Sequence, residues 1–400
     1  MATTKYLYNL TPLRGIAALL TVIFHGELYL NFIGGSMLID QSKSFFINGL
    51  YIMVDFFFVL SGFILCYVYR DYFIKGFDKQ NFRKFFIARL ARIYPIHVFS
   101  LFFTAGIWAL AGGLGFPKFQ LIQVANSAYS FVTNLLLLHS INLHNWFTYT
   151  HASWSISTEW WMYMLFPFIV LPILKVPKKA WLVVVTACIG LYLLIEYVLG
   201  PSVVVPKELA SQFDGSMEPT LNVSYQYGFV RCLAGFVLGM ITYMAYNVKW
   251  AKNFLSSGWV FLVEISALVI CLHFKVNDIF KVLIFPFIIL TAAYGNASFN
   301  FILESKPLQK IGDWSYSIYL LHQPFLNLFT LVILATFPPK PGELSVQWSQ
   351  PEAWMCMTVF ILFVLWVSSL SYRFIEVPTR NWMNTKWGRR NVAAVNPSPV

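Results

Sequence analysis

The chain has 400 residues, of which 58% are hydrophobic, 18% are aromatic and only 11% are charged. Soluble domains carry about 25% charged residues, so this composition excludes a soluble protein. Many runs of about 20 residues are almost free of charge, which is the length that a helix needs to cross a bilayer, whereas a transmembrane β-barrel would show short alternating segments. The sequence therefore predicts an all-α protein, a polytopic transmembrane helical bundle.

Charge and cysteine patterns exclude further classes of protein. The formal net charge is +11, but lysine and arginine collect in the cytoplasmic loops of membrane proteins, so this charge requires no nucleic-acid partner. The five cysteines are scattered singly through apolar runs, which indicates small packed side chains and predicts neither a disulfide framework nor a metal site. No small-residue cleavage site follows the first apolar run, so we expect that run to remain as a span.

Ten apolar runs are long enough to be spans, and an eleventh is short. The ten runs cover about 12–33, 46–69, 85–112, 154–174, 180–200, 225–247, 257–273, 278–295, 314–336 and 354–376. The short run covers about 128–141, and segments of about 10–14 residues are more often re-entrant or interfacial than spanning. We therefore predict about ten spans plus one short re-entrant or interfacial helix.

Positive charge predicts the orientation of these spans. With ten spans and a cytoplasmic N-terminus, 21 of the 28 lysines and arginines lie on the cytoplasmic side, as the positive-inside rule favours. An eleventh span would place the cluster Lys175–Lys179 outside and reverse everything after it. The sequence thus predicts one transmembrane domain over 1–380, a basic and polar cytoplasmic tail over 381–400, and both termini in the cytoplasm.

The first span, LRGIAALLTVIFH, has an arginine near its start and a histidine at its end. Arg14 and His25 are eleven residues apart, so on a helix they share one stripe and lie about 16 Å apart along the axis. Ionisable side chains within a span are costly and usually face a cavity or a partner. We therefore interpret this helix as one wall of a polar site.

The second and third spans add an acid and a basic segment. Asp55 and Ser61 lie in the aromatic run VDFFFVLSGF. The segment before and within the third span carries Arg83, Arg89 and Arg92, and arginine forks match phosphate oxygens. The alternative is a topogenic cluster that contacts lipid headgroups, and charge alone favours that alternative.

The fourth span opens with WSISTEWWMYMLFP, in which polar residues recur at helical spacing. Ser155, Glu159 and Tyr163 are each four residues apart and so share one helix face. A glutamate at this depth is too costly to face lipid. It is either a structural partner for an arginine, with Arg231 of the sixth span an equally plausible partner, or an acid in a site.

The ninth span opens with IGDWSYSIYLLHQPF and repeats the pattern. Ser315, Tyr319 and His322 recur at four and three residues and share one face. A lone histidine in a span is more often an interhelical hydrogen-bonding group than a catalyst. Two such histidines, His25 and His322, each lie in a span with other polar groups on the same face, which weakens the purely structural interpretation. The external stretch of about 113–153 is rich in histidine and aromatic residues and is a candidate lid.

Seven segments, taken together, resemble a known family. They are LRGIAALLTVIFH, FFFVLSGF, ARLARIYP, WSISTEW, RCLAGFVLG, IGDWSYSIYLLHQPF and SYRFIEVPTR, in this order between about residues 12 and 380. The set resembles membrane-bound acyltransferase family 3, whose members O-acylate surface glycans and other extracytoplasmic acceptors. Met53 departs from the glycine usual at that position. The esterase-like domain that some members carry fused is absent from these 400 residues, so we expect transfer to be completed by this domain or by a separate periplasmic partner.

The resemblance implies an enzyme of the bacterial inner membrane that moves an acyl group, most often acetyl, from cytoplasmic acyl-CoA to an extracytoplasmic hydroxyl. Lipopolysaccharide, capsule, peptidoglycan or an exported small molecule would all fit as the acceptor. The expected catalytic residues are His25, as a base or an acyl carrier, with Glu159 and His322. The basic residues expected to hold the phosphates of CoA are Arg14, Arg83, Arg89 and Arg92. The side chains expected to line the substrate cavity are Asp55, Ser61, Trp154, Ser155, Ser157, Tyr163, Arg231, Ser315, Tyr316, Tyr319 and Glu376.

Two other classes of function compete with this interpretation. A transporter or flippase would be expected to show paired repeats or broken helices in corresponding halves, and the sequence shows neither. A sensor or scaffold would leave the polar residues within the spans unexplained. The sequence therefore favours an acyltransferase.

Overall fold

The computed structural model describes residues 6–35, 37–114, 125–204, 219–338, 346 and 348–388. This part of the chain is helical between its connections and contains no strand, which confirms the predicted all-α class. The helices in chain order are α1 (Leu10–Gly34), η1 (Asn48–Ile52), α2 (Met53–Phe73), α3 (Lys79–Leu114), α5 (Ala128–Leu135), η2 (His151–Ser153), α6 (Trp154–Leu174), η3 (Lys178–Ala180), α7 (Trp181–Leu194), η4 (Ile195–Leu199), α8 (Gly228–Tyr246), α9 (Lys249–Leu255), α10 (Gly258–His273), α11 (Asp278–Tyr294), α12 (Ala297–Leu303), α13 (Lys306–Asp313), α14 (Ser315–Thr336), α15 (Gln350–Ser371), η6 (Tyr372–Glu376), α16 (Val377–Met383) and η7 (Asn384–Gly388).

Within the described residues, eight helical runs are long and apolar enough to cross a membrane. They cover 10–34, 48–73, 79–113, 151–174, 178–199, 228–246, 315–336 and 350–388, and each corresponds to a predicted span. The other two predicted spans, 257–273 and 278–295, are the helices α10 and α11 of 16 and 17 residues. Such helices cover about 24–26 Å, slightly less than a hydrocarbon core of roughly 30 Å. Helix α10 reaches spanning length only together with α9, across a bend of 77°.

The short apolar run at 128–141 forms α5, which has eight residues and is about 12 Å long. Ser127 caps its start, because the Ser127 hydroxyl accepts a hydrogen bond from the Ser130 amide at 3.1 Å. The helix ends before Leu137, whose φ of 57° lies in the left-handed region. This segment therefore does not cross the membrane, as its length predicted. Of the predicted tail over 381–400, residues 381–388 are helical, and the remainder lies outside the described residues.

Glycine brings α2 and α8 into close contact at the centre of the bundle. A Cβ on Gly62 would lie 2.0 Å from the Phe236 carbonyl oxygen, and one on Gly239 would lie 1.9 Å from the Val59 carbonyl oxygen. Small residues at such crossings let helix backbones approach closely in membrane proteins. This contact fixes which side chains of α2 and α8 can meet.

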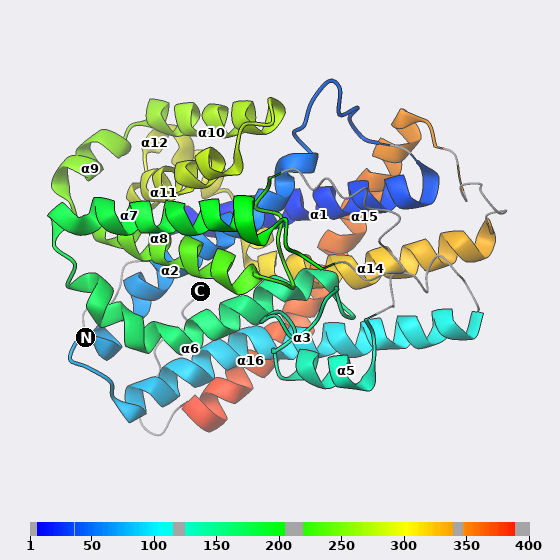
Figure 1. Ribbon diagram of the computed structural model, residues 1–400, viewed down its shortest axis with the longest axis horizontal. Coiled ribbons are helices and arrows are strands. Elements are labelled where there is room, and N and C mark those ends of the chain that lie inside the picture. The colour runs from blue at the N-terminus through cyan, green and yellow to red at the C-terminus, as the bar shows by residue number, and fades with distance from the viewer. Residues whose placement is uncertain are drawn as a thin grey trace.

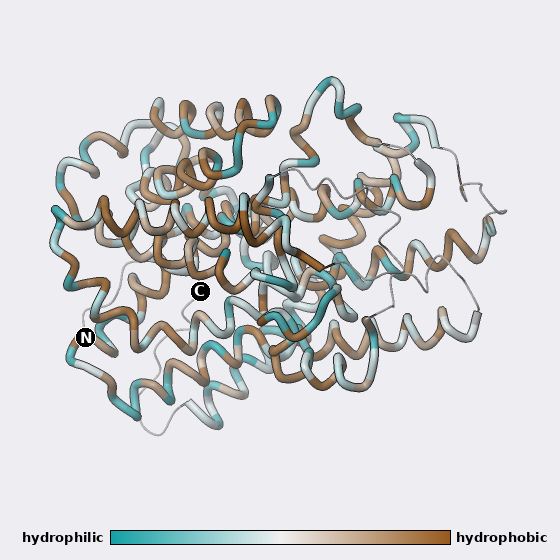
Figure 2. The backbone as a smooth tube through the Cα atoms, viewed as in Figure 1, coloured by the Kyte–Doolittle hydropathy of each residue, from teal (hydrophilic) through white to brown (hydrophobic). Residues whose placement is uncertain are grey.

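The helices run mainly along the long axis of the molecule, so the bundle has two ends (Figure 1). The N-terminal end of α1 and the α2–α3, α6–α7 and α8–α9 connections lie at the left end of Figure 1, which we call the basic end. Figure 2 shows brown along most helices and teal mainly at the connections. The lysines and arginines at or near the basic end include Arg70, Lys75, Lys79, Arg83, Lys84, Lys175, Lys178, Lys179, Lys249 and Lys252. Many of the lysines and arginines that the sequence predicts on one side of the membrane thus lie at one end of the bundle.

Candidate active site

Two histidines from distant parts of the chain meet within the bundle. The Nδ1 atom of His25 on α1 lies 3.1 Å from the Nε2 atom of His322 on α14, and the ring centroids are 5.0 Å apart. His322 is fully buried. The two helices that the sequence singled out for polar residues therefore carry one shared site.

The hydrogen-bond partners of this pair assign its protons. His322 Nδ1 lies 3.1 Å from the Ile318 carbonyl oxygen, which only accepts hydrogen bonds, so this nitrogen carries the proton and Nε2 of His322 is an acceptor. His25 Nδ1 faces both that acceptor and the Thr21 carbonyl oxygen, at 3.1 Å each, so it also carries a proton. Nε2 of His25 is then left with its lone pair, which is the atom a base or nucleophile would use.

Arg14 lies on the same helix, eleven residues closer to the basic end, or about 16 Å away. Within the described part of the chain it has neither a hydrogen-bond partner nor an ion-pair partner. It lies close enough to Arg92 and Glu159 to interact with their charges. An arginine without a partner inside a span is costly, so this position is suited to bind an anion.

Arg83, Arg89 and Arg92 differ in their surroundings along α3. Arg83 is exposed at the start of the helix. Arg89 is buried; it donates to the Tyr69 hydroxyl at 2.8 Å and lies over the Tyr69 ring, while its Nε has no partner. Arg89 can therefore still donate to a ligand.

Arg92 is instead paired with an acid. Its Nη1 lies 2.6 Å from Oε1 of Glu376, and the Ser317 hydroxyl donates to the other carboxylate oxygen at 3.0 Å. Arg92 also lies over the ring of Tyr316, whose hydroxyl donates to the Ile93 carbonyl oxygen at 2.6 Å. The pair joins α3 to η6, the helical turn that follows α15, and balances the charge of an arginine near Arg14.

Glu159 accepts a hydrogen bond from the Tyr163 hydroxyl at 2.7 Å. It lies near enough to Arg14 and Arg89 to interact with their charges, and Ser61 lies beside the Tyr163 hydroxyl. No hydrogen bond joins Glu159 to a histidine among the described residues. Glu159 therefore lies beside two arginines without an ion pair to either in the described part of the chain, and these contacts do not place it at the histidine pair.

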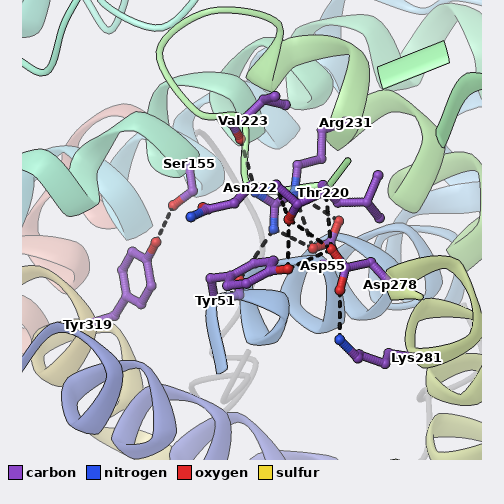
Figure 3. Close-up of polar contacts among 11 residues, drawn as sticks. Tyr51, Asp55, Ser155, Thr220, Asn222, Val223, Arg231, Asp278, Lys281 and Tyr319 are labelled. Atoms are coloured by element: carbon purple, nitrogen blue, oxygen red, sulfur yellow. Dashed lines mark hydrogen bonds and ion pairs between the residues drawn. The ribbon is translucent and has the colours of Figure 1, made fainter. Parts of the chain in front are cut away.

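Asp55 and Arg231 form a buried ion pair between α2 and α8 (Figure 3). The distance from Arg231 Nη2 to Asp55 Oδ2 is 2.5 Å, and both side chains are fully buried. Arg231 also donates to the carbonyl oxygens of Val223 and Tyr51, at 2.9 and 3.3 Å, and lies over the Trp154 ring. The Arg231 and Asp55 charges neutralise each other within the protein, so this pair holds α2 and α8 together.

A neighbouring cluster around Asp278 was not identified from the sequence. One of its carboxylate oxygens accepts from the Tyr51 hydroxyl at 2.6 Å and the Leu221 amide at 2.9 Å, and the other accepts from Lys281 at 2.8 Å. Figure 3 shows that this cluster adjoins the Asp55–Arg231 pair. The available signal was Lys281 within an apolar run, three residues after an acid, a spacing at which opposite charges pair on a helix.

The remaining predicted cavity residues mostly bond to one another or to the backbone. The hydroxyls of Ser155 and Tyr319 lie 2.7 Å apart and join α6 to α14. The Ser157 hydroxyl donates to the Leu137 carbonyl oxygen at 2.7 Å. The buried Ser315 hydroxyl has no partner among the described residues.

The sequence also did not single out the polar residues that follow His322 on α14. Gln323 donates to the Tyr29 hydroxyl at 2.6 Å, and that hydroxyl in turn donates to Asn327. Gln323 and Asn327 are four residues apart in the same span as His322, so helical spacing could have identified them.

Of the candidate lid over 113–153, residues 113–114 end α3 and residues 125–153 pack on the bundle. His139 lies 3.0 Å from the Ser153 hydroxyl, and its ring stacks on that of His97, with centroids 5.9 Å apart. Burial lowers the pKa of His139 to about 3, so it is neutral at physiological pH. His97 binds the Asn134 carbonyl oxygen at 2.8 Å. These two histidines therefore anchor the segment.

Comparison with known proteins adds to this geometry. A model of an acyltransferase domain, Acyl_transf_3, matches residues 7–373. Acyltransferase MdmB of Streptomyces mycarofaciens is 24% identical over 377 residues, which are 87% of this chain and 84% of MdmB. O-acetyltransferase OatA of Staphylococcus aureus is 24% identical over 406 residues, 95% of this chain and 58% of OatA, so the chain spans little more than half of that relative. No solved structure matches the chain.

Proposed function

Because the chain belongs to the acyltransferase 3 family, we propose that this membrane acyltransferase moves an acyl group from cytoplasmic acyl-CoA to a hydroxyl of an extracytoplasmic acceptor. Acetyl is the simplest acyl group, and a relative named O-acetyltransferase OatA supports it. A cell-surface polysaccharide such as lipopolysaccharide is the proposed class of acceptor. The observation that carries the proposal is one helix with an unpartnered arginine near the basic end and a paired histidine about 16 Å further on.

The donor would enter from the basic end, which we assign to the cytoplasm because positive charge collects there. Arg14 and Arg89 each have donor capacity left within the described part of the chain. Phosphate oxygens match guanidinium donors bidentately, so these residues are proposed to hold the CoA phosphates. Arg92 forms an ion pair with Glu376, so we assign it to the structure of the site and not to binding of the phosphates. The pantetheine arm would then bring the thioester up to His25.

The transfer itself would use the free nitrogen of His25. Nε2 removes the proton from the acceptor hydroxyl as the oxygen attacks the thioester carbonyl carbon. When the tetrahedral intermediate collapses, the new ester C–O bond remains, the C–S bond breaks, and the proton passes from Nε2 to the departing thiolate. His322 accepts the Nδ1 hydrogen bond of His25 and so stabilises the charge that His25 gains. In the alternative route, Nε2 of His25 attacks the thioester carbonyl carbon, the C–S bond breaks, and the acyl group then passes from Nε2 to the acceptor hydroxyl.

A transporter finds less support than an acyltransferase. Such proteins pair broken helices in corresponding halves, and the described residues contain one bent pair, α9 with α10. Arg14 and His25 lie on α1 and His322 lies on α14, so these residues belong to helices other than the bent pair.

The experiment that tests the proposal uses the purified protein in liposomes with labelled acetyl-CoA and a panel of hydroxylated glycans. We expect acetate to appear as a glycan ester, and mass spectrometry would show the acetyl increment on the glycan. Cells with and without the gene provide the same comparison on surface glycans. Movement of the glycan across the bilayer without any ester would overturn the proposal in favour of a flippase.

A further inference from the structure

A cavity of about 230 Å³ lies between α1, α14 and α15. Its wall on α1 runs from Gly26, the residue after His25, to Ile33. Ile333 and Thr330 on α14 and Met355, Met357 and Val359 on α15 line the other walls. This cavity plays no part in the transfer described above.

The cavity begins next to the position proposed for the thioester of the donor. Gly26 adjoins His25 at the level of the histidine pair, and Ile33 lies seven residues beyond, or about 10 Å further from the basic end. Arg14 lies in the opposite direction along the same helix. A donor whose phosphates lie at Arg14 and whose thioester carbonyl lies at His25 would therefore point its acyl chain toward this cavity.

The chemistry of the wall fits a hydrocarbon chain and not a sugar. Leucine, isoleucine, phenylalanine, methionine and valine make up most of the lining. The Tyr29 hydroxyl is bonded to Gln323 and Asn327, so this hydroxyl is already satisfied within the protein. The Thr330 hydroxyl has no partner among the described residues, but one hydroxyl replaces few of the hydrogen bonds that a sugar would lose with water, and that loss is costly.

Gly26 and Met357 define the floor of the cavity. A Cβ on Gly26 would lie 2.3 Å from Cε of Met357, so the thioether rests directly against the α1 backbone. Methionine is flexible and adapts to irregular apolar ligands. The rim includes Met355 and Val359, which are exposed on the surface that faces lipid, so a long chain could continue into the bilayer.

We propose that this cavity is the binding site for the acyl chain of the donor, and that the enzyme uses acyl-CoA with chains of about four to eight carbons as well as acetyl-CoA. This inference rests on the proposed function. A cavity of about 150 Å³ holds a benzene molecule in a well-studied case, so about 230 Å³ accommodates more than six carbons. Each methylene that enters improves apparent donor affinity about fourfold, which corresponds to about 0.8 kcal/mol.

The test compares acetyl-, butyryl-, hexanoyl- and octanoyl-CoA at one fixed acceptor concentration in liposomes. We expect kcat/KM to rise from acetyl to hexanoyl and then to level off, because longer chains pass the rim. The variant Ile333→Phe fills the cavity and should lower the ratio of hexanoyl to acetyl kcat/KM about tenfold or more, with acetyl transfer retained. Val332→Phe is the matched control, because Val332 is the preceding residue, is exposed and does not line the cavity. It should leave the ratio unchanged within about twofold.

Several outcomes would overturn the inference. One is a wild-type enzyme that transfers acetyl but gains nothing from butyryl or hexanoyl. Another is an Ile333→Phe ratio equal to that of Val332→Phe, which would indicate that the cavity holds only a membrane lipid. If Ile333→Phe fails to fold, Met357→Ala replaces it: a widened floor should extend the rise in kcat/KM from hexanoyl to octanoyl, and an unchanged chain-length profile rejects the site. Absence of transfer from every acyl-CoA by the folded wild type would instead reject the proposed function.

Discussion

Two arginines within the helices of this bundle, the buried Arg231 and the half-buried Arg14, have opposite surroundings. Arg231 on α8 donates to Asp55 and to two backbone carbonyl groups, and its side chain is fully buried. Arg14 on α1 has no partner among the described residues and lies near another arginine, Arg92. The first charge is satisfied within the protein, and the second is not.

The difference separates structure from function. A buried ion pair with all its donors met stabilises the arrangement of helices and has little capacity left for a ligand. A guanidinium within a span and without a partner raises the energy of the empty site, and a bound anion removes that cost. We therefore propose Arg14 for the donor site, while Asp55 and Arg231, which the sequence placed in the cavity, form a buried ion pair.

The largest expected effect comes from His25, which lies on the same helix as the unpartnered Arg14. His25→Asn should lower acceptor acylation about 10²–10⁴-fold, because an amide cannot take a proton near neutral pH. Donor binding and membrane insertion should be retained. The measurement is acylated product at matched protein levels, with labelled acetyl-CoA binding as the control. Retention of more than about a tenth of wild-type turnover would move the chemistry to His322.

Substitutions in the Asp55–Arg231 pair should lower the stability of the protein and leave its use of the donor unchanged. Arg231→Ala leaves Asp55 buried without a partner, which should cost about 3–5 kcal/mol, so the protein should lose most of its thermal stability in detergent. The double change Asp55→Leu with Arg231→Met removes both charges and should recover much of that loss. The thermal midpoint by static light scattering checks both. Wild-type stability in Arg231→Ala would show that the pair does not hold α2 to α8.

The sequence predicted the relations that lie within one helix. Apolar runs indicated every span, and helical periodicity placed Arg14 and His25 on one stripe, because both properties depend only on neighbours along the chain. Partners across helices could not be deduced. Arg231 was considered for Glu159, but the close contact of α2 with α8 at Gly62 and Gly239 brings Asp55 to it instead.

The same limit applies to other contacts of the site. Arg92 and Glu376 are 284 residues apart, and His25 and His322 are 297 apart, so their meeting depends on the packing of the whole bundle. The histidines of the candidate lid were interpreted from composition alone. The structure shows His97 and His139 bound to groups of that segment, because a buried imidazole needs hydrogen-bond partners.

Arg14→Ala should have a smaller effect than His25→Asn, and on donor use. Loss of a charge-assisted bond to phosphate costs about 1.5–3 kcal/mol, so the apparent KM for acetyl-CoA should rise about tenfold to a hundredfold. Arg14→Lys should recover only part, since lysine lacks the planar fork. Arg83→Ala is the matched comparison, because Arg83 is an exposed arginine whose charge is screened. Equal KM values for Arg14→Ala and Arg83→Ala would make Arg14 a topogenic charge only.

The smallest expected effect concerns a satisfied hydroxyl close to the site. Tyr319 and Ser155 join α14 to α6 through one hydrogen bond of 2.7 Å, and such a bond contributes about 0.5–1.5 kcal/mol net. In Tyr319→Phe the Ser155 hydroxyl keeps the Ala152 carbonyl oxygen, at 3.3 Å, as its acceptor, so no buried group is left without a partner. We therefore expect a small drop in thermal midpoint and less than about a tenfold change in turnover. A fall of about a hundredfold or more, at unchanged donor KM, is the size expected for loss of an oxyanion donor. It would show that Tyr319 turns from Ser155 to the reacting oxygen during transfer.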